Sequence, residues 1–469
     1  MDPLILLFVG VTVIVGCILI LKLHPVLALL FAAIIVGVFT GENNLVQFAQ
    51  IKGMSAAETL DLVNQPVGQR IAAAFGNTAS KIGILIAMAA IIGTCLLRSG
   101  AADKIIRAAL KLFGEKGAPV AFLTSGFTLA IPVFFDTVFY LLVPLSKAMT
   151  LRSGKNYLFY ITAVVAGGAM AHSLVPPTPG PLFVAAEMGV DMGVMMVGGL
   201  VVGMFTITGG YLYAAWANRK WTIPLRDSSD VTISELEDLM NKEDRHLPAL
   251  WLSLMPIILP ILLISGNTIT KAILSEGLLF SLFSFFGNPN IALTLAAVVA
   301  LGTLAWNERD RTKLKQYIVE SLKGAGMIIL ITSMGGAFGG TLQQTGIGAR
   351  IQELASVYHI AILPLAFFVT VLMRTAQGSA TVAMITSVGI LGGFASMGDL
   401  AFHPVYLALV IGCGSKPIPW MNDSGFWVVC TMSGMTETET LKTFSSVLTI
   451  MGFIGLFVII ILAKLFPLI

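Results

Sequence analysis

Five ionisable residues lie inside long apolar segments of this sequence, where a charge is costly. They are Asp136, His172, Arg374, Lys416 and Asp423. An ionisable side chain at membrane depth usually marks a substrate or ion site, so each is a candidate functional residue. Asp136 and Asp423 can hold a proton or a cation, and His172 is a further proton-coupling candidate because an imidazole titrates near neutral pH.

Structural roles are the alternative for three of these side chains. Arg374 can cap carbonyl groups at a hairpin turn, and Lys416 can extend along its helix so that the ammonium reaches the membrane surface. His172 can be a hydrogen-bonded packing residue.

Two irregular stretches interrupt apolar segments close to these residues. Four prolines in residues 175–181 (VPPTPGP) exceed what a kinked helix requires and predict an unwound loop. The second half has GSAT at 378–381 and NDS at 422–424. Unwound backbone exposes N–H groups that can bind a carboxylate, while hydroxyl and amide side chains match the hydroxyls of a sugar acid. The predicted substrate-binding residues are Thr137, Ser173, Thr178, Gly180, Arg374, Gly378, Ser379, Thr381, Asn422 and Ser424.

The composition places the chain in a membrane. Hydrophobic residues make up 56% and charged residues 11% of the 469 residues, and the mean hydropathy is +0.90. Such a surface is too apolar for water, so we expect a polytopic inner-membrane protein. The four cysteines lack metal-ligand spacing. We expect no cofactor, no metal and no nucleic-acid partner.

The sequence is repeated once. Residues 93–105 (GTCLLRSGAADKI) align with 339–351 (GGTLQQTGIGARI), and the same offset places 131–137 on 377–383 and 175–181 on 421–427. This repeat predicts an N-terminal unit at 1–216, a cytoplasmic linker at 217–247 and a C-terminal unit at 248–469.

Apolar segments of spanning length predict the helices of each unit. Residues 118–146 and 360–395 are interrupted near their centres and predict re-entrant hairpins. Residues 269–286 predict an interfacial helix, or alternatively a contact between two copies in a homodimer. The predicted crossings are 4–21, 25–40, 82–97, 157–188 with a break, 194–216, 250–264, 291–306, 325–342, 404–432 with a break, and 447–465.

With the N-terminus outside, most of the 28 lysines and arginines fall on cytoplasmic segments, as the positive-inside rule requires. An odd number of crossings per unit makes the second repeat inverted. The predicted fold is therefore an all-α polytopic membrane protein of two inverted repeats, each with a re-entrant hairpin and a broken transmembrane helix.

The motifs AHSLVPPTPGP, GSATVAM and NDSGFW, with IPVFFDTVFYLLVPL in the first hairpin, resemble the gluconate permease (GntP) family of the ion transporter superfamily. The resemblance runs nearly from end to end. It implies secondary active uptake of gluconate or a related small carboxylate, usually with protons, by an elevator-like motion. The chain departs from the family at Asp136, where the family has Glu, and at Thr178, where the family has His.

The leading interpretation is a proton-coupled symporter of gluconate or a related hydroxy-carboxylate, and not an enzyme. Alternatives within the class are a Na⁺-coupled carrier, or a carrier of glycerate or of an amino acid such as D-serine. A passive channel and an intramembrane hydrolase that uses Asp136 and Asp423 as an aspartyl pair are the alternatives from other classes.

Overall fold

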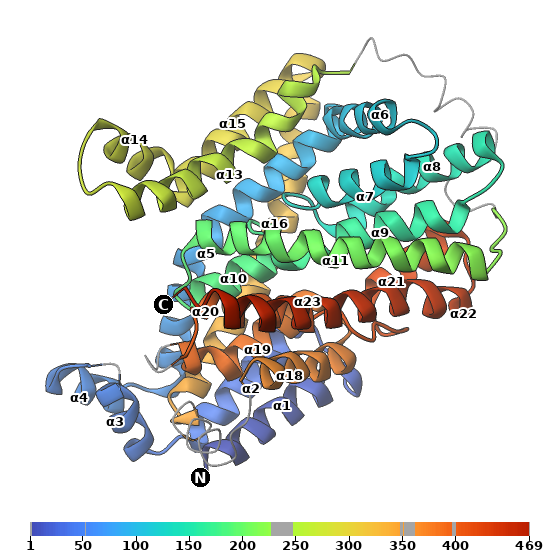
Figure 1. Cartoon of the computed structure of the whole chain (residues 1–469). Coiled ribbons are helices and arrows are strands. Elements are labelled where there is room, and N and C mark those ends of the chain that lie inside the picture. The colour runs from blue at the N-terminus through green and yellow to red at the C-terminus, as the bar shows by residue number, and fades with distance from the viewer. Residues whose placement is uncertain are drawn as a thin grey trace.

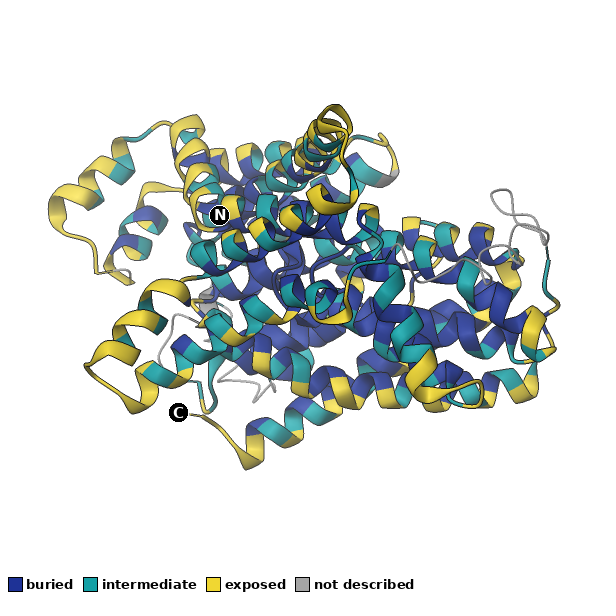
Figure 2. Ribbon diagram, turned by 90° about the horizontal axis from the view of Figure 1, so that it is seen from above, coloured by how far each residue is buried: buried dark blue, intermediate teal, exposed yellow. Residues whose placement is uncertain are grey.

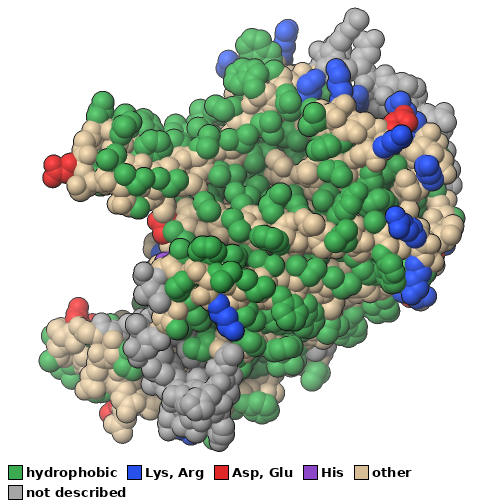
Figure 3. Space-filling model, viewed as in Figure 1, with side chains coloured by type: hydrophobic (Ala, Val, Ile, Leu, Met, Phe, Trp, Pro, Cys, Tyr) green, Lys and Arg blue, Asp and Glu red, His purple; other side chains and the backbone are tan. Residues whose placement is uncertain are grey.

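The computed structural model describes residues 2–51, 53–226, 247–347, 350, 362–395 and 400–468. The regular elements in these ranges are helices. Seven described helical segments are long and apolar enough to cross a membrane, or eight if the bent pair α2 (Pro25–Phe39) and α3 (Glu42–Ile51) forms one span. Hydrophobic side chains cover the middle of the face in Figure 3, and lysines and arginines gather at its right-hand edge and top. The predicted all-α polytopic class is confirmed.

Several apolar helices begin with the same local signal, which is a capping side chain followed by proline. The cap accepts a hydrogen bond from a free N–H of the first turn, and proline at the first position loses no hydrogen bond. The cap residues are Asp2 of α1 (Pro3–Leu19), His24 of α2, Asn288 of α15 (Pro289–Asn307) and His403 of α20 (Pro404–Gly414).

The helices occur in the same order in both halves, with boundaries close to the offset seen in the sequence. This correspondence agrees with a duplicated unit, and the inversion of the second copy stays a prediction. The matching pairs are α1 with α13 (Leu250–Ile273), α5 (Val67–Arg98) with α16 (Arg311–Gln343), α7 (Ala118–Leu129) with α18 (Ile362–Gln377), α8 (Phe135–Ser153) with α19 (Ala380–Ala395), α9 (Tyr157–Leu174) with α20, α10 (Pro179–Glu187) with α21 (Ser424–Ser433), and α11 (Met192–Lys220) with α23 (Ser446–Leu465).

Some helices are longer than predicted. The predicted spans 82–97, 250–264 and 325–342 are parts of α5, α13 and α16, which continue through polar turns that a search for apolar residues leaves out. The predicted interfacial helix 269–286 is wrong as one element, because α13 continues to Ile273 and a separate α14 (Leu278–Phe286) follows Gly277.

The predicted linker 217–247 also differs at its start. Helix α11 extends through Lys220, four residues into that range. Residues 227–246, which make up most of the predicted linker, lie outside the described ranges.

The helices pack as two groups. The framework group consists of α1, α2, α5, α13, α15 and α16, in which α5 packs along both α15 and α16. The core group consists of α7–α11 and α18–α23, including the short α22 (Glu437–Thr440) and the π-helical turn η2 (Leu441–Ser445). Figure 1 shows α9, α11 and α23 in adjacent rows across the centre, and Figure 2 shows buried residues concentrated inside the bundle.

Small residues bring the two groups together where α16 meets α19. A Cβ added to Gly339 would lie 2.8 Å from the Cα of Gly389, so backbone faces backbone at this point. One turn earlier on α16, the Ile385 side chain of α19 lies against Gly335, so glycines on α16 let α19 pack closely.

The first helix of the first hairpin is too short to cross a bilayer. Helix α7 has 12 residues and spans about 18 Å, against about 30 Å of hydrocarbon. Residues 130–134 separate α7 from α8, and the Nε of Arg152 near the end of α8 lies 2.6 Å from Glu115, just before α7. The two ends of this hairpin therefore lie together.

We expect cysteines placed at Lys111 and Ser153 to be labelled from the same side of the membrane by an impermeant thiol reagent. The Arg152–Glu115 contact holds the two ends of the hairpin at one end of the bundle. A cysteine at Glu276, between α13 and α14, serves as the opposite-side control. Labelling of positions 111 and 153 from different sides would show that α7 and α8 together cross the membrane.

Candidate functional site

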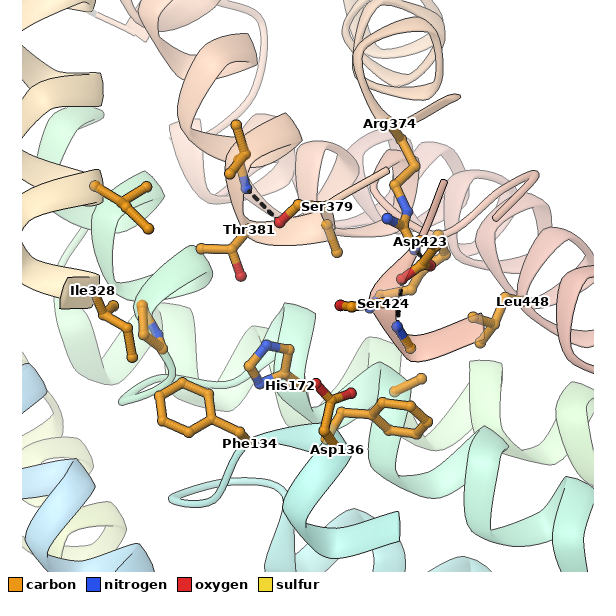
Figure 4. Close-up of a pocket in the computed structure, with 18 of the residues that line it drawn as sticks. Phe134, Asp136, His172, Ile328, Arg374, Ser379, Thr381, Asp423, Ser424 and Leu448 are labelled. Carbon is orange, nitrogen blue, oxygen red and sulfur yellow. Dashed lines mark hydrogen bonds and ion pairs between the residues drawn. The ribbon is translucent and has the colours of Figure 1, made fainter. Parts of the chain in front are cut away.

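A cavity of about 280 Å³ lies between the core group and helix α16 of the framework group. Residues of the two halves face each other across it: in Figure 4, Phe134, His172 and Asp136 lie on one side and Ser379, Thr381 and Ser424 on the other. Its polar and charged wall residues are Asp136, His172, Thr332, Arg374, Ser379, Thr381, Lys416, Asp423 and Ser424.

Four half-helices begin at this cavity. Phe134 precedes the first turn of α8 and Asp423 precedes that of α21, while Pro179 and Ala380 are the first residues of α10 and α19. All four residues line the cavity. The first turn of a helix has N–H groups without intrahelical acceptors and carries about half a positive charge. The first turn of α10 offers fewer donors than the others, because Pro179 and Pro181 have no N–H. The four helix dipoles directed at one cavity suit an anion.

Local sequence explains why these helices break here. Helix α9 ends at Leu174 because Val175 precedes Pro176, and a residue before proline avoids helical geometry. The prolines that follow cannot donate the hydrogen bonds of a continued helix. Helix α18 ends before Gly378, whose φ of +78° is a conformation that other residues rarely adopt.

Arg374 connects the two breaks of the second half. Its guanidinium donates to the carbonyl of Gly378, at the tip between α18 and α19, and to the carboxylate of Asp423, at the start of α21. The second oxygen of Asp423 accepts a hydrogen bond of 2.7 Å from the N–H of Gly425. Both side chains of the ion pair are buried, so the pair holds the tip against the broken helix.

Lys416 and Asp136 have no such partner. Lys416 is 4% exposed and lines the cavity, yet it forms no hydrogen bond or ion pair within the part of the chain that the structure describes. The carboxylate of Asp136 likewise has no hydrogen-bonding or ion-pair partner among the described residues. Since Arg374 and Asp423 neutralise each other, Lys416 and Asp136 are the charges available to a ligand.

The two aspartates approach each other across Gly425. A Cβ added to this glycine would lie 3.3 Å from the Oδ1 atom of Asp423 and 3.7 Å from the Oδ1 atom of Asp136. The carboxylate of Asp136 therefore lies near the Arg374–Asp423 pair at the start of α21. His172 lies close by, with its Nδ1 atom buried and without a partner among the described residues and its ring 5.9 Å from the ring of Phe134.

The structure brings seven of the thirteen predicted residues to the cavity wall: Asp136, His172, Arg374, Ser379, Thr381, Asp423 and Ser424. Among these, Thr381 and Ser424 have hydroxyl groups without a hydrogen-bond partner among the described residues. Their role in binding stays a prediction.

The other six predicted residues do not line this cavity. Thr137 lines a second cavity on the far side of Phe134. The other five make contacts at the helix breaks. In the first half, Ser173 accepts a hydrogen bond from Ser415, Thr178 donates to the Val175 carbonyl, and Gly180 lies against Met384. In the second half, the Gly378 carbonyl accepts a hydrogen bond from Arg374, and Asn422 donates to the Thr375 carbonyl.

Sequence reasoning missed the apolar part of the wall. Ile328 and Ile331 of α16 face the half-helix ends, and Phe444 and Leu448 close the side near α21. Nothing in the sequence distinguishes these residues, because an apolar side chain in a spanning helix has the same pattern whether it faces lipid, protein or a cavity.

We expect Asp423→Asn to destabilise the protein by about 3 kcal/mol, because it leaves Arg374 as a buried charge without a counter-ion. Thermal unfolding of the purified protein in detergent measures the change. The matched control is Glu115→Gln, which breaks a pair whose two side chains are 60% and 56% exposed and is expected to cost less than about 1 kcal/mol. Equal unfolding temperatures for Asp423→Asn and the wild type would contradict a structural role for the ion pair.

Comparison with known proteins identifies the family and the fold of this chain. The family model described as GntP family permease matches residues 2–466. A gluconate permease of Pseudomonas aeruginosa is 30% identical over 94% of this chain and 93% of its own length, and an uncharacterized permease of Haemophilus influenzae is 34% identical over 93% and 87%. The YdaH transporter of Alcanivorax borkumensis, whose crystal structure has an unusual topology, shares the fold with a TM-score of 0.60 and 12% identity over 95% of this chain and all of that one.

The family match covers nearly the whole chain, and the similar proteins are permeases. The molecule is therefore a multi-pass inner-membrane transporter and not an enzyme, which sets aside the intramembrane hydrolase. This chain belongs to the gluconate permease family.

Proposed function

We propose that this protein is a proton-coupled symporter of gluconate or a related small hydroxy-carboxylate. The observation that carries the proposal is the cavity in which four helix N-termini, Lys416 and the hydroxyls of Ser379, Thr381 and Ser424 come together. The N-termini and Lys416 suit a carboxylate, and the hydroxyls match those of a sugar acid.

The charge balance supports proton coupling. With Arg374 and Asp423 paired, a bound carboxylate would leave two negative charges, its own and that of Asp136, beside the single positive charge of Lys416. A proton on Asp136 removes the excess. Proton binding and anion binding therefore favour each other, and this coupling is reciprocal. A sodium ion beside Asp136 would satisfy the same balance, so ion dependence must be measured.

Packing supports an elevator-like motion. The cavity lies where the core group meets the framework group, with the breaks on the core side and α16 on the other. Movement of the core group along the backbone contact between Gly339 and Gly389 would carry the half-helix ends and their ligand together past α16. This is the geometry that alternating access requires.

We expect Asp136→Asn to abolish gluconate accumulation driven by a pH gradient while substrate exchange between equal concentrations continues. Asparagine keeps the shape of the side chain but cannot release a proton. Uptake and counterflow in proteoliposomes separate the two activities, and counterflow also distinguishes a carrier from a passive channel. Asp61→Asn, which changes an exposed carboxylate on α4 (Ala56–Asn64), is the control.

Two results would count against the role given to Asp136. Accumulation by Asp136→Asn under a pH gradient alone would move the coupling group elsewhere, with His172 the next candidate in the cavity wall. A strict sodium requirement of the wild type at fixed pH would replace the proton by a cation.

We expect Thr381→Ala and Ser424→Ala each to raise the half-saturation concentration of gluconate by roughly two- to tenfold, the loss that one hydrogen bond produces. Asn422→Ala should instead lower thermal stability, because this side chain caps the carbonyl end of α18. Thr294→Ala, an exposed threonine on α15, is the matched control. Unchanged half-saturation in both cavity variants would place the substrate elsewhere.

A further inference from the structure

A second cavity of about 270 Å³ lies beside the first, between the tip of the first hairpin and the framework helices α5 and α16. The proposed transport site does not include this cavity. Its polar wall residues are Thr94 and Arg98 of α5, Thr137 of α8, and Glu320 and Ser321 of α16.

Phe134 separates the two cavities. This residue lines both, and in Figure 4 its ring stands at the edge of the first cavity near Ile328. Along α16 the cavities are consecutive, because Gly324 and Ala325 line the second while Ile328, one turn further, lines the first. The second cavity thus continues the first toward the end of the bundle where Arg98 lies.

The polar groups of the second cavity are not satisfied by one another. Ser321 is 8% exposed, and its buried hydroxyl has no hydrogen-bond partner among the described residues. The hydroxyls of Thr94 and Thr137 also form no hydrogen bond within the described ranges. Thr94 and Thr137 are half-buried, and Ser321 is the buried hydroxyl of the three. Buried hydroxyls normally have partners, so the Ser321 hydroxyl at this cavity indicates a polar ligand.

Arg98 supplies a positive charge that is only partly occupied. One guanidinium nitrogen lies 3.9 Å from a carboxylate oxygen of Glu320, and the group lies over the Tyr317 ring at 4.6 Å. A guanidinium has five N–H donors in a planar fork that fits a carboxylate, so this loose ion pair leaves donors for a second one.

We propose that the second cavity is a transient binding site for the transported hydroxy-carboxylate, on its route between the first cavity and the side of the membrane where Arg98 lies. Arg98 binds the carboxylate, the hydroxyls of Thr94, Thr137 and Ser321 bind the substrate hydroxyls, and Phe134 is the partition between the two sites. Glu320 competes with the substrate carboxylate for Arg98. This competition lowers the affinity of the site, so the anion can leave it. This inference rests on the proposed function, since it assigns the same class of substrate to a second site.

Protection of engineered cysteines from a thiol reagent tests the proposal in the full-length protein. Gluconate is the probe, Ser321→Cys reports on the second cavity and Ser379→Cys on the first. The wild type, whose four cysteines are buried, gives the background labelling. We expect gluconate to slow labelling at both positions. Adding Arg98→Gln should raise the gluconate concentration for half-protection of Ser321→Cys by roughly tenfold, while protection of Ser379→Cys is unchanged.

The matched control is Arg152→Gln, which removes an exposed arginine paired with Glu115 away from both cavities and should change neither protection. If Arg98→Gln leaves half-protection of Ser321→Cys unchanged, the protection arises from closure of the transporter, and the second site is refuted while the proposed function stands. Protection of Ser379→Cys alone would likewise refute only the second site. Protection of neither position would overturn the proposed function together with the second site. Thr94→Cys replaces Ser321→Cys if the latter does not fold.

Discussion

The guanidinium of Arg374 holds together the two irregular segments of the second half. Unwound backbone at membrane depth has polar groups that lipid cannot satisfy, so it needs partners from the protein. Arg374 provides them by contacting the Gly378 carbonyl and the Asp423 carboxylate together. The approach is so close that a Cβ on Gly378 would overlap the Asn422 carbonyl oxygen. Because this contact fixes where α19 and α21 begin, it also fixes where their free N–H groups point.

This constraint divides the charged residues of the cavity into two kinds. The Arg374–Asp423 pair is committed to structure, and its charges cancel. Lys416 and Asp136 have no committed partner among the described residues, so their charges respond to whatever enters. A transporter needs such groups, because a site that is fully satisfied when empty gains little from binding its substrate. Helix N-termini favour the carboxylate of Asp136, and Lys416 follows the C-terminal end of α20, where the helix dipole favours a cation.

The sequence predicted the breaks and most of the polar residues that line the cavity, and it missed Thr332 and the apolar wall. Prolines at 175–181 and charges within apolar segments can be recognised from the sequence alone, because each conflicts with an ordinary spanning helix. The direction in which a side chain points at a break cannot be read from the sequence. Thr137, in the first turn of α8, therefore lines the second cavity, and Asn422, just before α21, caps α18. Which residues of α16 line the cavity depends on how the core group packs against the framework group. No local sequence pattern predicts that packing.

The repeat explains the symmetry of the backbone and leaves the charges asymmetric. At the offset that aligns the halves, Asp136 corresponds to Val382, Lys416 to Met170 and Asp423 to Pro177. Each half therefore supplies half-helix ends to the same cavity, but one half supplies the free carboxylate and the other the free ammonium and the structural ion pair. Duplication alone would place like charges opposite each other, which repel. Divergence of the side chains on a shared backbone instead produces a cavity in which an anion and a proton can each offset the charge of the other.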